Sequence, residues 1–213
     1  MTEQLPIEQQ QEKLPLFVRY KFKIVYATGS LPIDHAHYLY GSIKSIAPEF
    51  EHLENVGIFR ICGSKIPNSF HFRIIPNKSS ISIRCPAEYV NSVLKLRNNS
   101  FRIGKNFVYV RHPQVFVEKP IQHAYSPMVV IHKLDRWANP DEIQHDIQKL
   151  YPNSEVHVIP QKKTLKIHNN IVIGYPVIIK NLNEEESLKL QFFGVGGRRK
   201  FGCGIFVKYE GFV

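Results

Sequence analysis

The order of strand-like and helix-like segments constrains the fold of this chain more than any other feature of its sequence. From residue 18 to residue 26, apolar residues alternate with Arg19, Lys21 and Lys23, which is typical of a strand with one buried and one cationic face. After a turn, apolar residues recur at helical spacing up to Pro48. These expected inward positions are Ile33, Ala36, Leu39, Tyr40, Ile43 and Ala47. The structured part therefore opens with a strand and a helix.

The remaining segments repeat this order. In the first half, strands are expected at 57–62, 70–75, 81–84 and 106–111, with a short helix at 88–96. In the second half, strands are expected at 127–134, 155–159, 164–167, 171–180 and 204–209, with helices at 141–150 and 184–191; Asn183 and Glu186 suit the start of the last helix.

The same order thus occurs twice: a strand and a helix, then further strands, then a second helix and a last strand. It predicts an α+β fold of tandem ferredoxin-like (RRM-like) domains, a plan also used by RNA-recognition modules. We expect a flexible tail at 1–14, one domain at 15–115 and a second at 124–213 that carries a glycine-rich loop at 194–204. No close internal sequence repeat supports the duplication, which rests on element order alone.

Charge favours a polyanionic partner. The 213-residue chain has a formal net charge of +10, and the first fifteen residues contribute three Glu against one Lys, so the remainder carries about +12. A small acidic substrate would not require this excess. No apolar run of about 18 residues is present, and we expect a soluble, cytoplasmic protein without membrane attachment.

Cysteine and histidine spacing argues against a metal. Cys62, Cys85 and Cys203 are isolated, with no Cys-x-x-Cys pair. His35 and His37 are two residues apart, whereas neighbouring ligands on a helix would be four apart. We expect neither a bound metal nor a cofactor.

Residues 194–204 place two Gly-x-Gly turns on either side of three consecutive cations. The glycines would let backbone N–H groups approach a ligand, and the cations would attract a phosphate chain. Walker and dinucleotide-binding loops differ in residue type or position. RNA is therefore the favoured ligand, with a solvated turn as the alternative; the candidate RNA-binding residues are Gly194, Gly196, Gly197, Arg198, Arg199, Lys200, Gly202 and Gly204.

This C-terminal motif, closing a tandem ferredoxin-like chain, resembles the glycine-rich loop of the CRISPR-associated repeat-processing endoribonucleases of the RAMP superfamily. Residues 31–40 and 186–191, together with 196–199, look most like the Myxan-type branch of the Cas family numbered six. The likeness spans nearly the whole chain after residue 16. It implies metal-independent cleavage of CRISPR repeat RNA, often beside a short hairpin, and partners among the subunits of an interference complex.

Such cleavage uses the ribose 2′-OH as nucleophile and leaves a 2′,3′-cyclic phosphate and a 5′-OH. Histidine suits the proton transfers because its pKa lies near neutrality. On the expected helix, His35 lies on one polar flank with Tyr38 and Ser42, and His37 lies on the other with Gly41 and Lys44, whose ammonium could serve the same phosphate. The resemblance favours His35, and His52 is the candidate just beyond the helix.

Alternatives and unassigned residues remain. A non-catalytic RNA-binding subunit of the same superfamily would share the charge and the loop, whereas a small-molecule sensor would share only the fold. Lys162, Lys163 and Lys166 either extend the RNA track or form a solvated edge. The histidines without a motif are interpreted as surface or strand residues: His71, His112, His123, His132, His145, His157 and His168.

Overall fold

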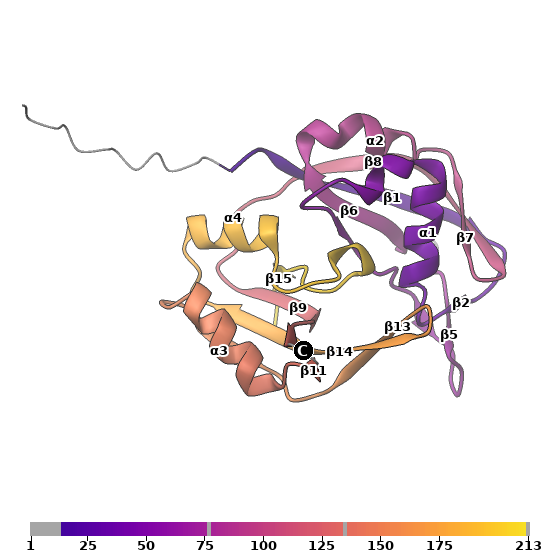
Figure 1. Ribbon diagram of the computed structural model, residues 1–213. Coiled ribbons are helices and arrows are strands. Elements are labelled where there is room, and N and C mark those ends of the chain that lie inside the picture. Colours follow the sequence, from indigo (N-terminus) through magenta and orange to yellow (C-terminus); the bar gives the residue numbers. More distant parts are fainter. Residues whose placement is uncertain (1–13, 76–77, 134–135, 212–213) are drawn as a thin grey trace, which may run out of the picture.

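Two five-stranded antiparallel sheets, one from each half of the sequence, form the body of the protein in the computed structural model (Figure 1). The structure describes residues 14–75, 78–133 and 136–211. Of the expected tail at 1–14, only Leu14 falls within these ranges. The fold is α+β, in agreement with the class predicted from the sequence.

The first sheet has the strand order β3-β6-β1-β8-β7. Its strands are β1 (Phe17–Ala27), β3 (Gly57–Ile58), β6 (Ser80–Pro86), β7 (Ser100–Ile103) and β8 (Asn106–Val117), and its helices are α1 (Ala36–Ile46) and α2 (Val90–Leu94). The predicted alternation in β1 is confirmed as far as Ile24, since Tyr20, Phe22 and Ile24 are buried. It is wrong for Tyr26, which is 59% exposed and follows a shift in the pairing register with β8. The three buried side chains share one core with Leu39 and Ile43 of α1, so the apolar side of this helix covers the apolar face of the sheet.

The second sheet has the order β12-β14-β9-β15, and β13 also pairs with β14. Its strands are β9 (Ala124–Val129), β12 (Glu155–Val158), β13 (Lys163–Ile167), β14 (Asn170–Lys180) and β15 (Val207–Lys208), and its helices are α3 (Pro140–Leu150) and α4 (Glu184–Phe193). The predicted start of α4 is confirmed, because Asn183 and Glu186 form a reciprocal capping box. The expected strands at 127–134 and 204–209 are shifted and shortened, respectively, and Leu134 lies outside the described residues.

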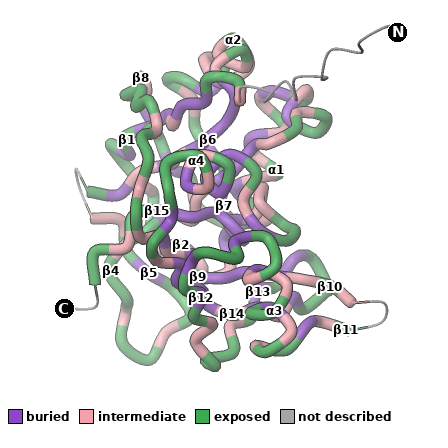
Figure 2. Tube along the Cα trace, turned by 90° about the vertical axis from the view of Figure 1, so that its left-hand side faces the viewer, coloured by how far each residue is buried: buried purple, intermediate pink, exposed green. Residues whose placement is uncertain are grey.

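Short elements complete the fold. They are the strands β2 (Leu31–Pro32), β4 (Ser64–Lys65), β5 (His71–Arg73), β10 (His132–Lys133) and β11 (Arg136–Trp137), and the 3₁₀ turns η1 (Pro48–Glu51), η2 (Ala87–Tyr89) and η3 (Arg199–Phe201). Figure 2 shows exposed stretches mainly along the loops and buried stretches within both sheets. No helix within the described ranges is long and apolar enough to span a membrane.

The beginning of α1 differs from the sequence expectation. Leu31 and Pro32 pair with β5, and the Ile33 N–H donates to the carbonyl of Phe70, so the backbone is still extended where the helix was expected. The helix begins at Ala36, and Ile33, predicted to point inward, is 37% exposed. Pairing in a small sheet therefore delays the helix by about one turn and changes which residues face the solvent.

The two halves are joined by a buried arginine. Arg84 of β6 is only 4% exposed, and its Nε donates to Glu118 Oε1 at 2.8 Å. One of its Nη atoms donates to the carbonyls of Phe206, at 2.7 Å, and Gln191, at 3.4 Å. Because a buried guanidinium needs all of these acceptors, this side chain fixes the first sheet against α4 and the segment before β15.

Candidate active site

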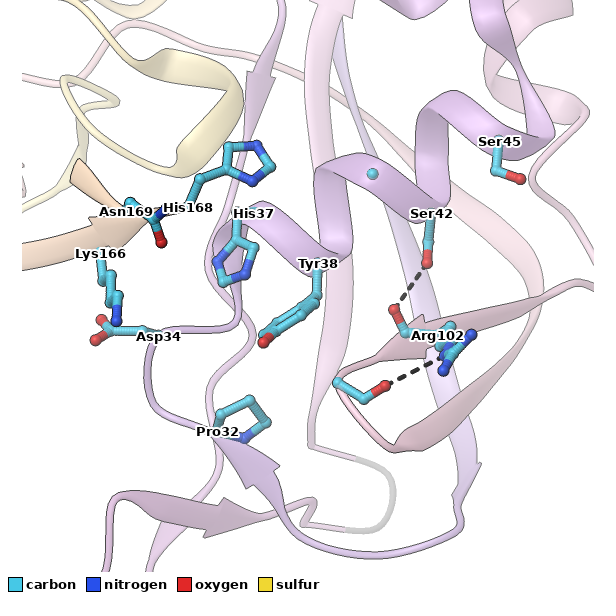
Figure 3. Close-up of a pocket in the computed structure, with 12 residues that line it drawn as sticks. Pro32, Asp34, His37, Tyr38, Ser42, Ser45, Arg102, Lys166, His168 and Asn169 are labelled. Carbon is cyan, nitrogen blue, oxygen red and sulfur yellow. Dashed lines mark hydrogen bonds between the residues drawn. The ribbon is translucent and has the colours of Figure 1, made fainter.

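A cleft of about 940 Å³ lies between α1 and the β13–β14 hairpin (Figure 3). It draws residues from both halves of the chain. The charged and aromatic side chains on its wall are Asp34, His37, Tyr38, Arg102, Lys166 and His168. Ser42 also lines the cleft, and its hydroxyl donates to the carbonyl of Arg102 at 2.8 Å, which fastens α1 to β7.

His37 stands in the first turn of α1 and faces this cleft. Its ring centroid is 3.8 Å from that of Tyr38 and 5.7 Å from that of His168. Burial lowers the pKa of His37, the charge of His168 lowers it further, and the carboxylate of Asp34 opposes both effects. The neutral imidazole is therefore favoured, which is the form that accepts a proton.

His35 has a different environment. It is 2% exposed, its Nδ1 donates to the carbonyl oxygen of Ile33 at 3.0 Å, and its Nε2 accepts from the Ile61 N–H at 2.8 Å. Burial, aided by the charge of Arg60, lowers the pKa of His35 to about 4. With both ring nitrogens occupied, this histidine fixes the start of α1 rather than lining the cleft. The sequence predicts His35 on a polar helix flank because it predicts an earlier start of the helix, whereas the helix begins at Ala36.

Lys44 and His52 lie apart from His37. The Lys44 ammonium is 2.6 Å from Glu51 Oε1 and rests over the ring of Tyr40, and neither Lys44 nor His52 is among the residues that line the cleft. The expected pairing of His37 with Lys44 is thus not formed, because Glu51 of η1 holds the lysine. The two flanks predicted for α1 instead meet on one wall, where His37 and Tyr38 lie together.

Most glycines of the 194–204 segment are required by the protein's own backbone. A Cβ on Gly204 would lie 2.1 Å from the carbonyl oxygen of Val195, and one on Gly194 would lie 2.4 Å from that of Gly204. Both residues have positive φ. Gly196 and Gly202 are similarly crowded, whereas a Cβ on Gly197 would meet nothing within 4 Å. Gly197 is therefore the glycine of this segment whose surroundings leave room for a ligand.

The three cations of this segment also differ. Arg199 donates to the carbonyls of Phe192 and Phe193, and the Lys200 ammonium donates to those of Phe50 and Glu51. Burial lowers the pKa of both Arg199 and Lys200. Lys200 therefore ties the segment to the end of η1 in the first half of the chain, and Arg199 ties it to α4.

Arg198 remains at the surface. It is exposed, has a left-handed backbone with φ 65°, and lines two hollows of about 480 and 630 Å³ on either side of Gly196 and Gly197. Contact of Arg198, Arg199 and Lys200 with RNA stays a prediction. Of the three, the exposed Arg198 is the one whose position leaves its charge available to a phosphate.

Sequence reasoning missed part of this site. The sequence predicts His168 as a surface or strand residue and Lys166 as part of an RNA track or a solvated edge, and it assigns no role to Arg102. No local motif marks these residues, since the cleft forms when the β13–β14 hairpin packs against α1.

Within the described residues, no His, Cys, Asp or Glu side chains are grouped as a metal site would require.

Both walls of this cleft lie within the part of the chain that matches a known family. The family described as Cas6 CRISPR matches residues 18–211. The chain belongs to the Cas6 family of CRISPR-associated endonucleases. A Cas6 relative, the CRISPR-associated endonuclease Cas6 of Myxococcus xanthus (strain DK1622), is 24% identical over 180 residues, which are 84% of this chain and 76% of the relative.

Solved Cas6-related structures share the fold. The product of a Cas6-related gene from Pyrococcus furiosus superposes with a TM-score of 0.65 at 16% identity, covering 92% of this chain and 98% of that one. A structure described as a RAMP protein binding different RNA substrates gives a TM-score of 0.65 at 14% identity, covering 92% and 100%. These likenesses show a shared fold, and they include both halves of this Cas6 chain.

Proposed function

We propose that this Cas6 protein is an endoribonuclease that cuts CRISPR repeat RNA without a metal ion. The observation that carries the proposal is the cleft on α1, where His37 faces an open space beside two cationic side chains. The Myxococcus xanthus relative is named an endonuclease, and the RAMP structure is described as binding RNA. Both descriptions agree with the chemistry that the cleft can support.

In the proposed reaction, the ribose 2′-OH attacks the adjacent phosphorus and loses its proton, while the bond from phosphorus to the 5′-oxygen breaks. His37 accepts that proton, since burial favours its neutral form. Arg102 and Lys166 line the same cleft and stabilise the negative charge that develops on the phosphorane oxygens. The products are a 2′,3′-cyclic phosphate and a 5′-OH. Tyr38, whose ring lies against that of His37 at a tilt of 40°, orients the imidazole or a base.

RNA binding is proposed to use a separate surface. Arg198 and Gly197 form the open side of the glycine segment, which we propose contacts the phosphate chain of the repeat stem. Arg199 and Lys200 hold this surface in place, because their side chains donate to backbone carbonyls of the protein. In this arrangement the glycine segment holds the RNA and the α1 cleft cuts it.

We also propose that each half is a ferredoxin-like domain, at 15–115 and 124–213. In chain order, the first, third and second main strands lie side by side in both sheets, with the fourth on the other side of the first. Antiparallel neighbours in this order, with two helices packed on the sheet, are what the split βαβ plan requires. Cleavage at their junction would need both domains.

The test uses a synthetic RNA that carries the CRISPR repeat of the source genome, incubated with the protein in EDTA. We expect one cut that leaves a 2′,3′-cyclic phosphate. The variant His37→Ala should lose about 100-fold or more in single-turnover cleavage rate while still binding the RNA. His52→Ala removes an exposed histidine outside the cleft and is the matched control, with an unchanged rate expected.

Two results would contradict the proposal. Strict dependence on magnesium would exclude the metal-free reaction. RNA that is bound but never cut would instead identify a non-catalytic RNA-binding subunit.

A further inference from the structure

A second histidine reaches the proposed active site from the other half of the chain. His168 occupies the tight turn between β13 and β14, whose last paired residues are Ile167 and Asn170. The turn places His168 in the cleft opposite α1, with its ring centroid 5.7 Å from that of His37 (Figure 3). Two imidazoles at this separation can serve the same phosphodiester, one on each side.

The backbone of His168 has a positive φ, which is uncommon for any residue other than glycine. Its φ is 53°, in the left-handed region where glycine or asparagine is common in hairpin turns. The chain therefore keeps a histidine at a position whose geometry favours other residues, and it does so at the rim of the cleft. Such a position supports a functional role for the side chain.

The charged groups around His37 come from three elements. Asp34 precedes α1, Arg102 lies on β7, and Lys166 and His168 lie on β13 and its turn. A charge on His168 lowers the pKa of His37, so His37 is favoured in the neutral form that accepts a proton. The two imidazoles therefore stand in one cleft, on opposite walls, as an acid and a base acting together would require.

We propose that His168 is a second catalytic residue of this reaction, the general acid that gives its proton to the departing 5′-oxygen while His37 accepts the proton of the 2′-OH. The bond from the 2′-oxygen to phosphorus forms as the bond from phosphorus to the 5′-oxygen breaks. One proton enters the protein at His37 and one leaves it at His168, so the step needs no further reactant. This inference rests on the proposed endoribonuclease function.

The experiment compares two repeat RNAs, one natural and one in which sulfur replaces the 5′-oxygen at the cut site. A thiolate leaves without protonation, so the sulfur substrate does not need a general acid. The test variant is His168→Asn, because asparagine accepts the left-handed turn. The control is His145→Gln, which removes an exposed histidine of α3 outside the cleft.

We expect His168→Asn to cut the natural RNA about 100-fold more slowly than wild type, with unchanged binding, and to cut the sulfur substrate at nearly the wild-type rate. His37→Ala should stay slow on both RNAs. If His168→Asn cuts the natural RNA at the wild-type rate, the inference is overturned. If its cleavage rate falls equally on both substrates, the acid role is excluded. If wild-type protein cuts neither RNA, the proposed function itself fails.

Discussion

Two histidines at the start of α1 have different roles. His35 and His37 are two positions apart, yet His35 is enclosed by backbone groups and His37 opens onto the cleft. The contact that separates them is the Ile61 N–H, which donates to His35 Nε2 from a distant segment. His35 is consequently a positioning residue that stabilises the start of the helix on which His37 stands.

Acid should destabilise the protein through His35. Its pKa is lowered to about 4, so between pH 6.5 and pH 4 the unfolded chain binds a proton there that the folded chain does not. Stability is therefore lost as the pH falls through this window, by about 2 kcal/mol between pH 7 and pH 5. Urea unfolding of wild type and of His35→Gln at pH 7 and at pH 5 measures this loss of stability.

The variant should be less stable than wild type at pH 7, and its loss of stability between pH 7 and pH 5 should be smaller. Equal losses in both proteins would show that His35 does not remain neutral in the folded state.

The identity of His35 as a helix-start residue could not be read from the sequence. Asp34-His35 resembles the pair expected at a catalytic helix, and the spacing of His37 was equally compatible with function. Two contacts between residues far apart in the chain decide between them: Leu31 pairs with Phe72, which delays the helix, and the Ile61 N–H donates to His35. Local periodicity carries no information about it.

At the scale of elements, the glycine segment at 194–204 is a connection held by its own backbone hydrogen bonds. The N–H of Val195 donates to the carbonyl of Gly204 at 3.1 Å, and the N–H of Gly204 donates to that of Met128 at 2.7 Å. The segment therefore closes on itself and on the end of β9. Its glycines permit these close approaches of the backbone. The spacing of glycines in the sequence does not distinguish such backbone contacts from contacts to a phosphate.

Two alanine substitutions distinguish these roles. Gly204→Ala combines positive φ with a contact of 2.1 Å to a carbonyl oxygen, and it should cost about 2 kcal/mol or more of folding stability. Gly197→Ala enters open space and should change stability by less than about 0.5 kcal/mol. Thermal and urea unfolding give both values. A stable Gly204→Ala protein would refute the backbone explanation.

Elements with local signals were predicted closely. The capping boxes of α3 and α4 lie within four consecutive residues each, and both helices were expected within a few residues of their observed ends. Strands β3 and β15 are shorter than expected because their partners offer only brief pairing, with Ile58 opposite Ile83 and Val207 opposite Tyr125. Strand length thus depended on contacts that the sequence pattern does not specify.

For the whole molecule, the excess of positive charge should make RNA binding strongly dependent on salt. Arg198 is expected to contribute one phosphate contact, so Arg198→Ala should weaken binding and reduce the slope of log affinity against log salt by about one. Filter binding at several salt concentrations measures this slope. Lys149→Ala, an exposed cation at the end of α3, is the control.

An unchanged slope for Arg198→Ala would mean that this residue does not touch phosphate. Lys200→Ala should behave differently, because its ammonium donates to two carbonyls of the first half, and its main effect should be on stability.

The buried Arg84 has a consequence for the order of events during synthesis. Its carbonyl partners, at Gln191 and Phe206, are 107 and 122 residues further along the chain. The ribosome therefore synthesises Arg84 long before those two acceptors. Until the second half has been made, the surface of the first half that carries Arg84 stays exposed to water. The cleft between α1 and the β13–β14 hairpin, which takes residues from both halves, can form only after the second half has been made.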